Sequence, residues 1–189
     1  MNNVKRLAVG AALALPLLGA SPAVAANWDP QGTTLSVTQV GVATWTSDTG
    51  SSVACAHGAT TLSATGAVAM NTTVTNPVQY SNCTSTGNAA TALTFGTWSF
   101  TATSTTSVDL TVTSGSGIVG TFDAPITGCH IVYPSFFIAN NTWNNATHTL
   151  TINSTAALTW HATNIFCRPI YGTSYRWTAT YSIPGATIT

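Results

Sequence analysis

Beyond residue 26 the chain contains no Lys and no Glu, two residue types that favour helices. Thr is abundant in their place, and its β-branched side chain suits the pleated, half-buried surface of a strand. Charge is carried there only by two Arg and four Asp residues, which gives a net charge of −2. The sequence therefore predicts an all-β protein with an almost uncharged surface.

Alternation of apolar and polar residues marks several strands. The clearest strand covers residues 175–183, where aromatic and aliphatic residues alternate with Arg, Thr and Ser. Residues 93–95 and 98–102 alternate in opposite phases, which predicts a β-bulge at Gly96. Further strands are predicted at residues 33–42, 60–70, 73–80, 108–112, 150–152 and 158–160.

Short strands separated by Gly, Asn, Ser and Pro predict a single domain over residues 27–189. We expect a two-sheet antiparallel β-sandwich, Ig-like or jelly-roll-like, stapled by two disulfides. A lipid-facing barrel is the rival architecture, because uncharged alternating strands are also typical of it. The sandwich is favoured because few segments reach membrane-spanning length and the chain closes at Thr189 without an aromatic residue.

The first 26 residues have the pattern of a secretory signal peptide. Lys5 and Arg6 precede an apolar stretch at residues 7–18, and small residues at 23–25 form a cleavage site. A membrane anchor is the alternative, but the stretch is shorter than the roughly 20 residues needed to span a bilayer. We expect a secreted protein that acts outside the cell or in the cell envelope.

Four cysteines in an exported chain predict two disulfides. Three pairings are open, and the sequential one is favoured, Cys55–Cys83 with Cys129–Cys167. Each bond closes a loop of moderate length and is worth about 3–4 kcal/mol in the chain-entropy model. The chain has no CxxC motif and lacks the close cysteine pairs of a structural zinc site.

Two segments resemble parts of a known group of proteins. They are residues 96–108, GTWSFTATSTTSV, and 141–150, NTWNNATHTL. This chain resembles an uncharacterised group of small exported actinobacterial β-proteins with four cysteines, and the resemblance implies no catalytic residues. In composition the chain is also distantly similar to the alkane oxidation activator protein of pseudomonads.

Groups suited to catalysis or metal binding are few. The four histidines, at 57, 130, 148 and 161, have no second ligand at a local chelating spacing, although His148 and His161 could meet across two adjacent strands. No GxSxG motif occurs, and of the four aspartates only Asp123 lacks an easy surface interpretation. Two arginines cannot follow a nucleic-acid backbone. We expect no enzyme activity, no cofactor, no metal and no nucleic-acid partner.

Aromatic residues are the more credible contact groups, since six Trp and five Tyr are many for a small domain. Most of them are expected to fill the core. Trp143, in an Asn-rich segment, is the best candidate for an exposed contact, and Tyr133, Phe136 and Phe137 form a second candidate patch.

The sequence thus predicts an exported non-catalytic β-protein that acts by surface contact or assembly. The alternative is a carbohydrate- or lipid-contacting module that uses exposed aromatics. Candidate partners are a polysaccharide, a lipid, an envelope surface or a second copy, because uncharged strand edges lack the Lys residues that discourage pairing between copies.

Overall fold

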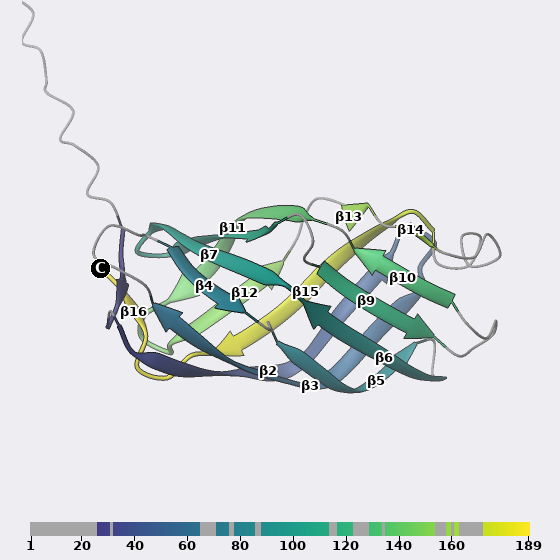
Figure 1. Ribbon diagram of the computed structural model, residues 1–189, viewed down its shortest axis with the longest axis horizontal. Coiled ribbons are helices and arrows are strands. Elements are labelled where there is room, and N and C mark those ends of the chain that lie inside the picture. Colours follow the sequence, from purple (N-terminus) through teal and green to yellow (C-terminus); the bar gives the residue numbers. More distant parts are fainter. Residues whose placement is uncertain are drawn as a thin grey trace, which may run out of the picture.

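A computed structural model describes residues 26–30, 32–64, 71–75, 78–85, 88–113, 117–122, 129–133, 135–153, 158–159, 161–162 and 172–189. These residues form strands, turns and bends in an elongated body (Figure 1). The predicted all-β class is confirmed. Within the described ranges no helix is long and apolar enough to cross a membrane.

Three strands share the central pairings of the sheet. They are β2 (Thr34–Ser47), β3 (Ser52–Ala64) and β15 (Ser174–Ser182). β2 lies between the other two and pairs antiparallel with β3 along one edge and with β15 along the other. Both edges of β2 are therefore occupied by backbone hydrogen bonds.

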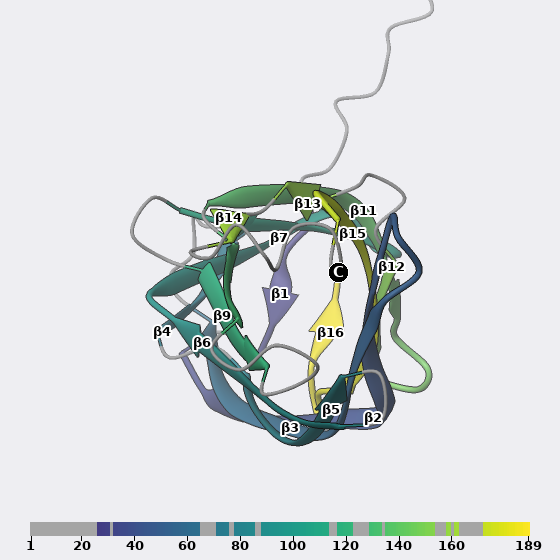
Figure 2. The same cartoon turned by 90° about the vertical axis from the view of Figure 1, so that its right-hand side faces the viewer.

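Five more strands close a ring with these three. They are β4 (Asn71–Thr75), β7 (Thr97–Ser104), β8 (Ser107–Val112), β11 (Phe136–Asn144) and β12 (Thr149–Asn153). The pairing runs from β3 through β4, β7, β8, β11 and β12 to β15, and β2 joins β15 back to β3. Figure 2 shows this ring end-on.

A second set of strands leaves β3 beside its pairing with β4. It consists of β5 (Gln79–Ser85), β6 (Asn88–Phe95), β9 (Gly117–Phe122), β10 (Cys129–Tyr133) and β14 (His161–Ala162). β14 is one residue away from β13 (Leu158–Thr159), and β13 pairs with β15. This second set of strands is therefore also connected to β15, because β14 follows β13 along the chain and β13 pairs with β15.

The described pairings give one 14-stranded antiparallel sheet and one two-stranded sheet. This arrangement does not confirm the predicted sandwich type. The predicted bulge at Gly96 is wrong. Gly96, with φ +78°, lies between the end of β6 and the start of β7. β6 pairs with β9, whereas β7 pairs with β4, so the change of phase occurs where the chain passes from one part of the sheet to another.

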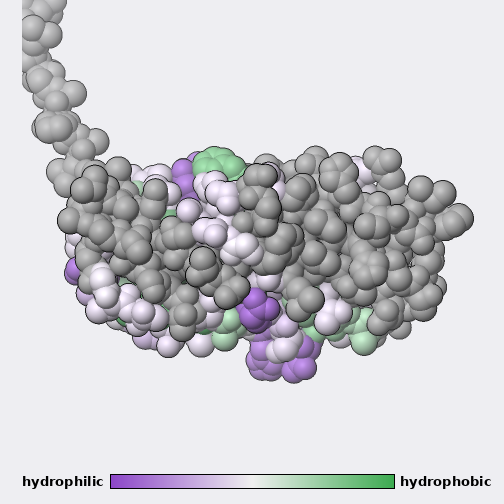
Figure 3. All heavy atoms as spheres, viewed as in Figure 1, coloured by the Kyte–Doolittle hydropathy of each residue, from purple (hydrophilic) through white to green (hydrophobic). Residues whose placement is uncertain are grey.

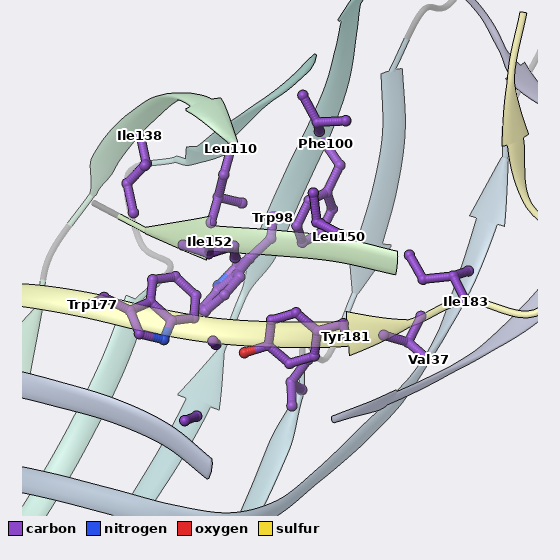
Figure 4. Packing of buried hydrophobic residues seen from close by; sticks show 14 of the residues in the cluster. Val37, Trp98, Phe100, Leu110, Ile138, Leu150, Ile152, Trp177, Tyr181 and Ile183 are labelled. Carbon is purple, nitrogen blue, oxygen red and sulfur yellow. The ribbon is translucent and has the colours of Figure 1, made fainter. Parts of the chain in front are cut away.

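Aromatic side chains meet inside the body that the ring of strands encloses, which we call the roll. Some of them come from strands that are not hydrogen-bonded to one another. The rings of Trp98 on β7 and Trp177 on β15 are 5.9 Å apart in an edge-to-face arrangement, and Phe136 on β11 contacts both. Trp45 on β2 stacks on its cross-strand partner Trp177 at 5.8 Å. Figure 4 shows how Trp98, Trp177 and Tyr181 approach one another among aliphatic residues. Such burial and ring contacts stabilise the fold.

Two buried tyrosines join strands that are not paired with each other. The hydroxyl oxygens of Tyr80 on β5 and Tyr181 on β15 are 2.5 Å apart. Burial raises the pKa of both phenols, and for Tyr80 the nearby Tyr181 raises it further. Both hydroxyls therefore stay protonated at neutral pH and satisfy each other.

The two-stranded sheet covers one end of the roll. It pairs β1 (Trp28–Asp29) with β16 (Thr187–Ile188), and both strands lie across the ring in Figure 2. Hydrogen bonds between Asn27 and Thr189, 2.9 and 3.0 Å long, extend this pairing. We call this feature the end cap.

Trp143 lies under the end cap and is only 1% exposed, so the prediction that it is an exposed contact is wrong. Its ring packs edge-to-face on Trp28 at 4.9 Å. Its indole N–H donates to Asn145 Oδ1, and the Asn145 side chain also bonds the backbone N–H and C=O of Ile188. The Asn-rich surroundings therefore satisfy buried backbone groups.

The predicted Cys55–Cys83 disulfide is confirmed. It joins residues that are Cα partners on β3 and β5, with a sequence separation of 28. The second predicted bond involves Cys167, which lies outside the described residues, as do residues 1–25 of the predicted signal peptide.

We expect Trp143→Ala to lower the free energy of unfolding by about 3–5 kcal/mol, because it removes a buried ring under the end cap. The matched control is Phe137→Ala, whose side chain is 57% exposed and whose replacement is expected to cost about 0.5 kcal/mol or less. Urea denaturation followed by tryptophan fluorescence measures both. Equal losses in the two variants would contradict the buried position of Trp143.

Candidate functional site

The structure separates the aromatic residues that the sequence singled out. Phe137 is exposed, Phe136 is half-buried against Trp98 and Trp177, and Trp143 is buried. Tyr133 belongs to β10, but its side chain is not among those described. Trp28, Trp45, Trp98 and Trp177 are buried as well, and Trp160 lies outside the described residues. These residues therefore form no exposed aromatic platform in the described part of the chain.

The titratable residues are scattered too. His148 lies in the turn before β12 and hydrogen bonds the Ala186 carbonyl, whereas His161 lies on β14, which pairs with β10. The sequence left open that these histidines meet across adjacent strands, but β12 and β14 are not paired with each other. Among the described residues no three His, Cys, Asp or Glu gather as metal ligands, and Asp123 lies outside them.

Among the aspartates that the structure describes, Asp48 accepts the most hydrogen bonds, and it tethers the β2–β3 turn to the start of β15. Its carboxylate accepts hydrogen bonds from the backbone N–H and hydroxyl of Thr173 and from the hydroxyl of Ser174, at 3.0 to 3.4 Å. Desolvation alone would raise the pKa of Asp48, but the hydrogen bonds from Ser174 and Thr173 together outweigh it and hold the pKa below its ordinary 3.8. These hydrogen bonds make Asp48 a structural joint between the turn after β2 and the start of β15.

The outer face of β11, β12, β15 and β2 carries hydroxyl groups in cross-strand rows. In one row, Thr142, Thr151, Thr180 and Val40 are successive Cα partners. In the next, Asn153, Thr178 and Thr44 are partners. The Thr151 and Thr180 hydroxyl oxygens lie 3.4 Å apart. We call these seven residues the outer wall.

Neighbouring rows are separated by two residues along a strand, about 6.8 Å, and neighbouring strands by about 4.8 Å. The outer wall is therefore a regular array of methyl and hydroxyl groups. Figure 3 shows one face of the molecule, on which the described surface is mostly pale, meaning of intermediate hydropathy, with small separate green and purple areas.

β2 bulges where it passes the outer wall. Its register with β15 jumps from Thr44–Thr178 to Val40–Thr180, and its register with β3 shifts over the same stretch. Gly41 has φ +71°, a conformation that glycine adopts without steric cost. The bulge leaves Val40 and Val42 49% and 56% exposed, although both are apolar.

A hollow lies on each side of this bulge. The one towards β15 and β12 measures about 180 Å³ and is lined by Val40, Val42, Thr151, Ile152, Asn153, Thr178, Ala179 and Thr180. The one towards β3 and β5 measures about 260 Å³ and is lined by Thr38, Gln39, His57, Gly58, Ala59, Gln79 and Ser81. Neither lining contains an acidic residue, a Lys or an Arg.

Arg176 orients one polar group of the first hollow. Its guanidinium donates two hydrogen bonds to Asn153 Oδ1, at 2.9 and 3.1 Å. Because the amide oxygen faces Arg176, the amide nitrogen of Asn153 is directed away from it. Arg176 therefore holds the side-chain amide of Asn153, which is one of the residues that line this hollow.

Sequence reasoning missed the outer wall because it searched for aromatic and titratable groups. The available signals were the outward Thr positions of residues 175–183 and the sequence Val-Gly-Val at 40–42, in which two apolar residues flank a glycine.

Comparison of the chain with protein-family models, curated proteins and solved structures finds no match.

We expect the hydrogen bonds of Asp48 to make the free energy of unfolding depend on pH in the acidic range. Because the folded pKa is lowered, the ionised carboxylate stabilises the fold above the ordinary pKa of 3.8, and this contribution is lost as the pH falls through the folded pKa. Urea midpoints between pH 7 and pH 2.5 should fall more steeply for the wild type than for Asp48→Asn, which has no carboxylate to protonate. Parallel curves for the two proteins would contradict this role.

Proposed function

We propose that this protein is an exported, non-catalytic β-protein that acts by surface contact, in the cell envelope or outside the cell, and that the outer wall is its contact surface. The observation that carries the proposal is the uncharged array of Thr hydroxyls beside two exposed valines on a fixed framework. Such a surface suits an electrically neutral partner, since its residues offer hydrogen bonds and methyl contacts and carry no charge, while the neighbouring Arg176 is hydrogen-bonded to Asn153.

Export is part of the proposal, with residues 1–26 as the signal peptide and 27–189 as the mature domain. The Cys55–Cys83 disulfide supports it, because such bonds persist in oxidising compartments. A second bond, Cys129–Cys167, and membership in the exported actinobacterial group belong to the same proposal.

We also infer that opposite walls of the roll pack face to face, as the two sheets of a sandwich do. Contacts of Trp98 and Phe136 with Trp177 support this, because they join strands that are not hydrogen-bonded to one another. The interior is thereby filled by side chains, and contact with a partner falls to the outside.

Contact through the outer wall is favoured over the alternatives. An aromatic platform for carbohydrate or lipid lacks support, since the five described tryptophans are buried. Assembly by strand-edge pairing is disfavoured for the eight-stranded ring, because each of its strands is paired on both sides. Metal-assisted catalysis lacks support, since no group of three or more His, Cys, Asp or Glu residues that could hold a metal occurs among the described residues.

The experiment is sedimentation of the oxidised mature protein with cell envelopes, insoluble polysaccharides and neutral phospholipid vesicles. We expect saturable binding to at least one of these surfaces, and at least a tenfold loss in Thr178→Lys/Thr180→Lys, which places two charges on the outer wall. The matched control is Ser99→Lys/Thr111→Lys, a half-buried cross-strand pair on β7 and β8.

Circular dichroism and thermal melting first establish that both variants fold. Wild-type protein that binds none of these surfaces, or a control variant that loses as much binding as the outer-wall variant, would overturn the proposal.

A further inference from the structure

The two hollows beside the β2 bulge lie on the same outer face of the roll. On one side, Thr151, Thr178 and Thr180 each lie between two buried neighbours. On the other side, exposed His57 precedes buried Gly58, and exposed Ser81 follows buried Tyr80. β2 is the strand between the two hollows, and its bulge separates them. At about 4.8 Å per strand, their centres are two to three strands apart, about 10–15 Å.

We propose that these hollows are two subsites for one linear, neutral polysaccharide chain, which crosses the β2 bulge and places one sugar unit in each. The inference rests on the proposed function and names the partner of its contact surface. Three properties of the hollows support it: their size, their chemistry and the fixed orientation of their polar groups.

The size of each hollow suits a single sugar ring. Volumes of about 180 and 260 Å³ lie below the 300–1,000 Å³ or so typical of pockets that enclose a drug-sized molecule. A polymer that presents one ring after another can use two small hollows, whereas a compact ligand of the same total size can enter neither.

The chemistry of the first hollow matches the two aspects of a sugar ring. A neutral sugar presents C–H groups on its faces and hydroxyls around its rim. Val40 and Val42 supply an apolar side, while the Thr151, Thr178 and Thr180 hydroxyls each both donate and accept hydrogen bonds. The second hollow adds His57, Ser81 and Gln79, which are also able to do both.

The charge of a saccharide chain decides how well it is accommodated by the two hollows. A carboxylated or sulfated chain would have to place its anions against linings that contain no Lys or Arg, and a burial of that kind is costly. The nearby cation, Arg176, is already engaged with Asn153. The hollows therefore favour a neutral chain over an acidic one.

Polar side chains that are held in place before binding raise the affinity that a shallow hollow can reach. The fork from Arg176 holds the Asn153 amide, and paired strands hold the Thr hydroxyls, so little side-chain freedom is lost on binding. Two weak subsites on one framework reinforce each other when a single chain spans both. Affinity should therefore depend on the length of the saccharide.

The experiment titrates the folded, oxidised mature protein with neutral gluco-, manno- and galacto-oligosaccharides of one, three and six units, using calorimetry and the Asn153 side-chain amide signal in NMR. Alginate oligomers serve as the acidic comparison. We expect at least one neutral series to bind, with affinity rising at least tenfold from one unit to six, and no comparable binding of alginate.

Variants then locate the site. Val42→Asp and His57→Ala alter exposed residues, one in each hollow, and each is expected to weaken binding of the six-unit chain at least fivefold. Phe137→Asp is the matched control, because Phe137 and Val42 are 57% and 56% exposed, and it should change affinity less than twofold.

The outcomes separate this inference from the proposed function. Wild-type protein that sediments through its outer wall but binds no neutral oligosaccharide overturns the inference and leaves the proposed function standing. Binding that does not depend on chain length, or that Phe137→Asp weakens as much as Val42→Asp, also overturns it. Protein that neither sediments nor binds oligosaccharides fails both proposals.

Discussion

Occupation of both edges of β2 is the constraint on which the rest of the structure depends. A strand with one open edge leaves backbone donors and acceptors without partners, and a chain with so few charges has little else with which to discourage pairing by another molecule. By joining β3 to β15, β2 turns an open sheet into a ring. The ring and its end cap bury the five described tryptophans, and hydroxyl and methyl groups lie on the described outer face of β2, β12 and β15.

The bulge of β2 is involved both in the closure of the strand ring and in the shape of the candidate site. Around Gly41, β2 carries two more residues than the facing stretch of β15 and one more than the facing stretch of β3. The bulge exposes two valines that regular pairing would leave in a flat face, and it opens a hollow on either side. A local irregularity of the backbone thus lies between two hollows on the described outer face.

Local alternation was enough to predict the all-β class and the strand at residues 175–183, which the structure places at 174–182, and the favoured one of three cysteine pairings included the Cys55–Cys83 bond. Ring closure could not be predicted, since it depends on which distant strands pair. Trp143 was misjudged because its Asn neighbours suggested a polar loop. Asn141 instead donates to the carbonyls of Val108 and Ile138, and Asn145 to Ile188, so these amides serve the buried backbone. The outer wall needed cross-strand register, which a sequence does not display.

The end cap has a consequence for the order of events in folding. β1 pairs with β16, and Asn27 with Thr189, so the earliest described strand waits for the last one. For a chain that emerges from its N-terminal end, Trp28 has no partner strand until nearly every other strand is available, and the cost of closing so long a loop has to be met by the finished roll. The end cap therefore cannot form until β16 is available, and the packing of Trp28 on Trp143 beneath it depends on a pairing between strands that are far apart in the sequence.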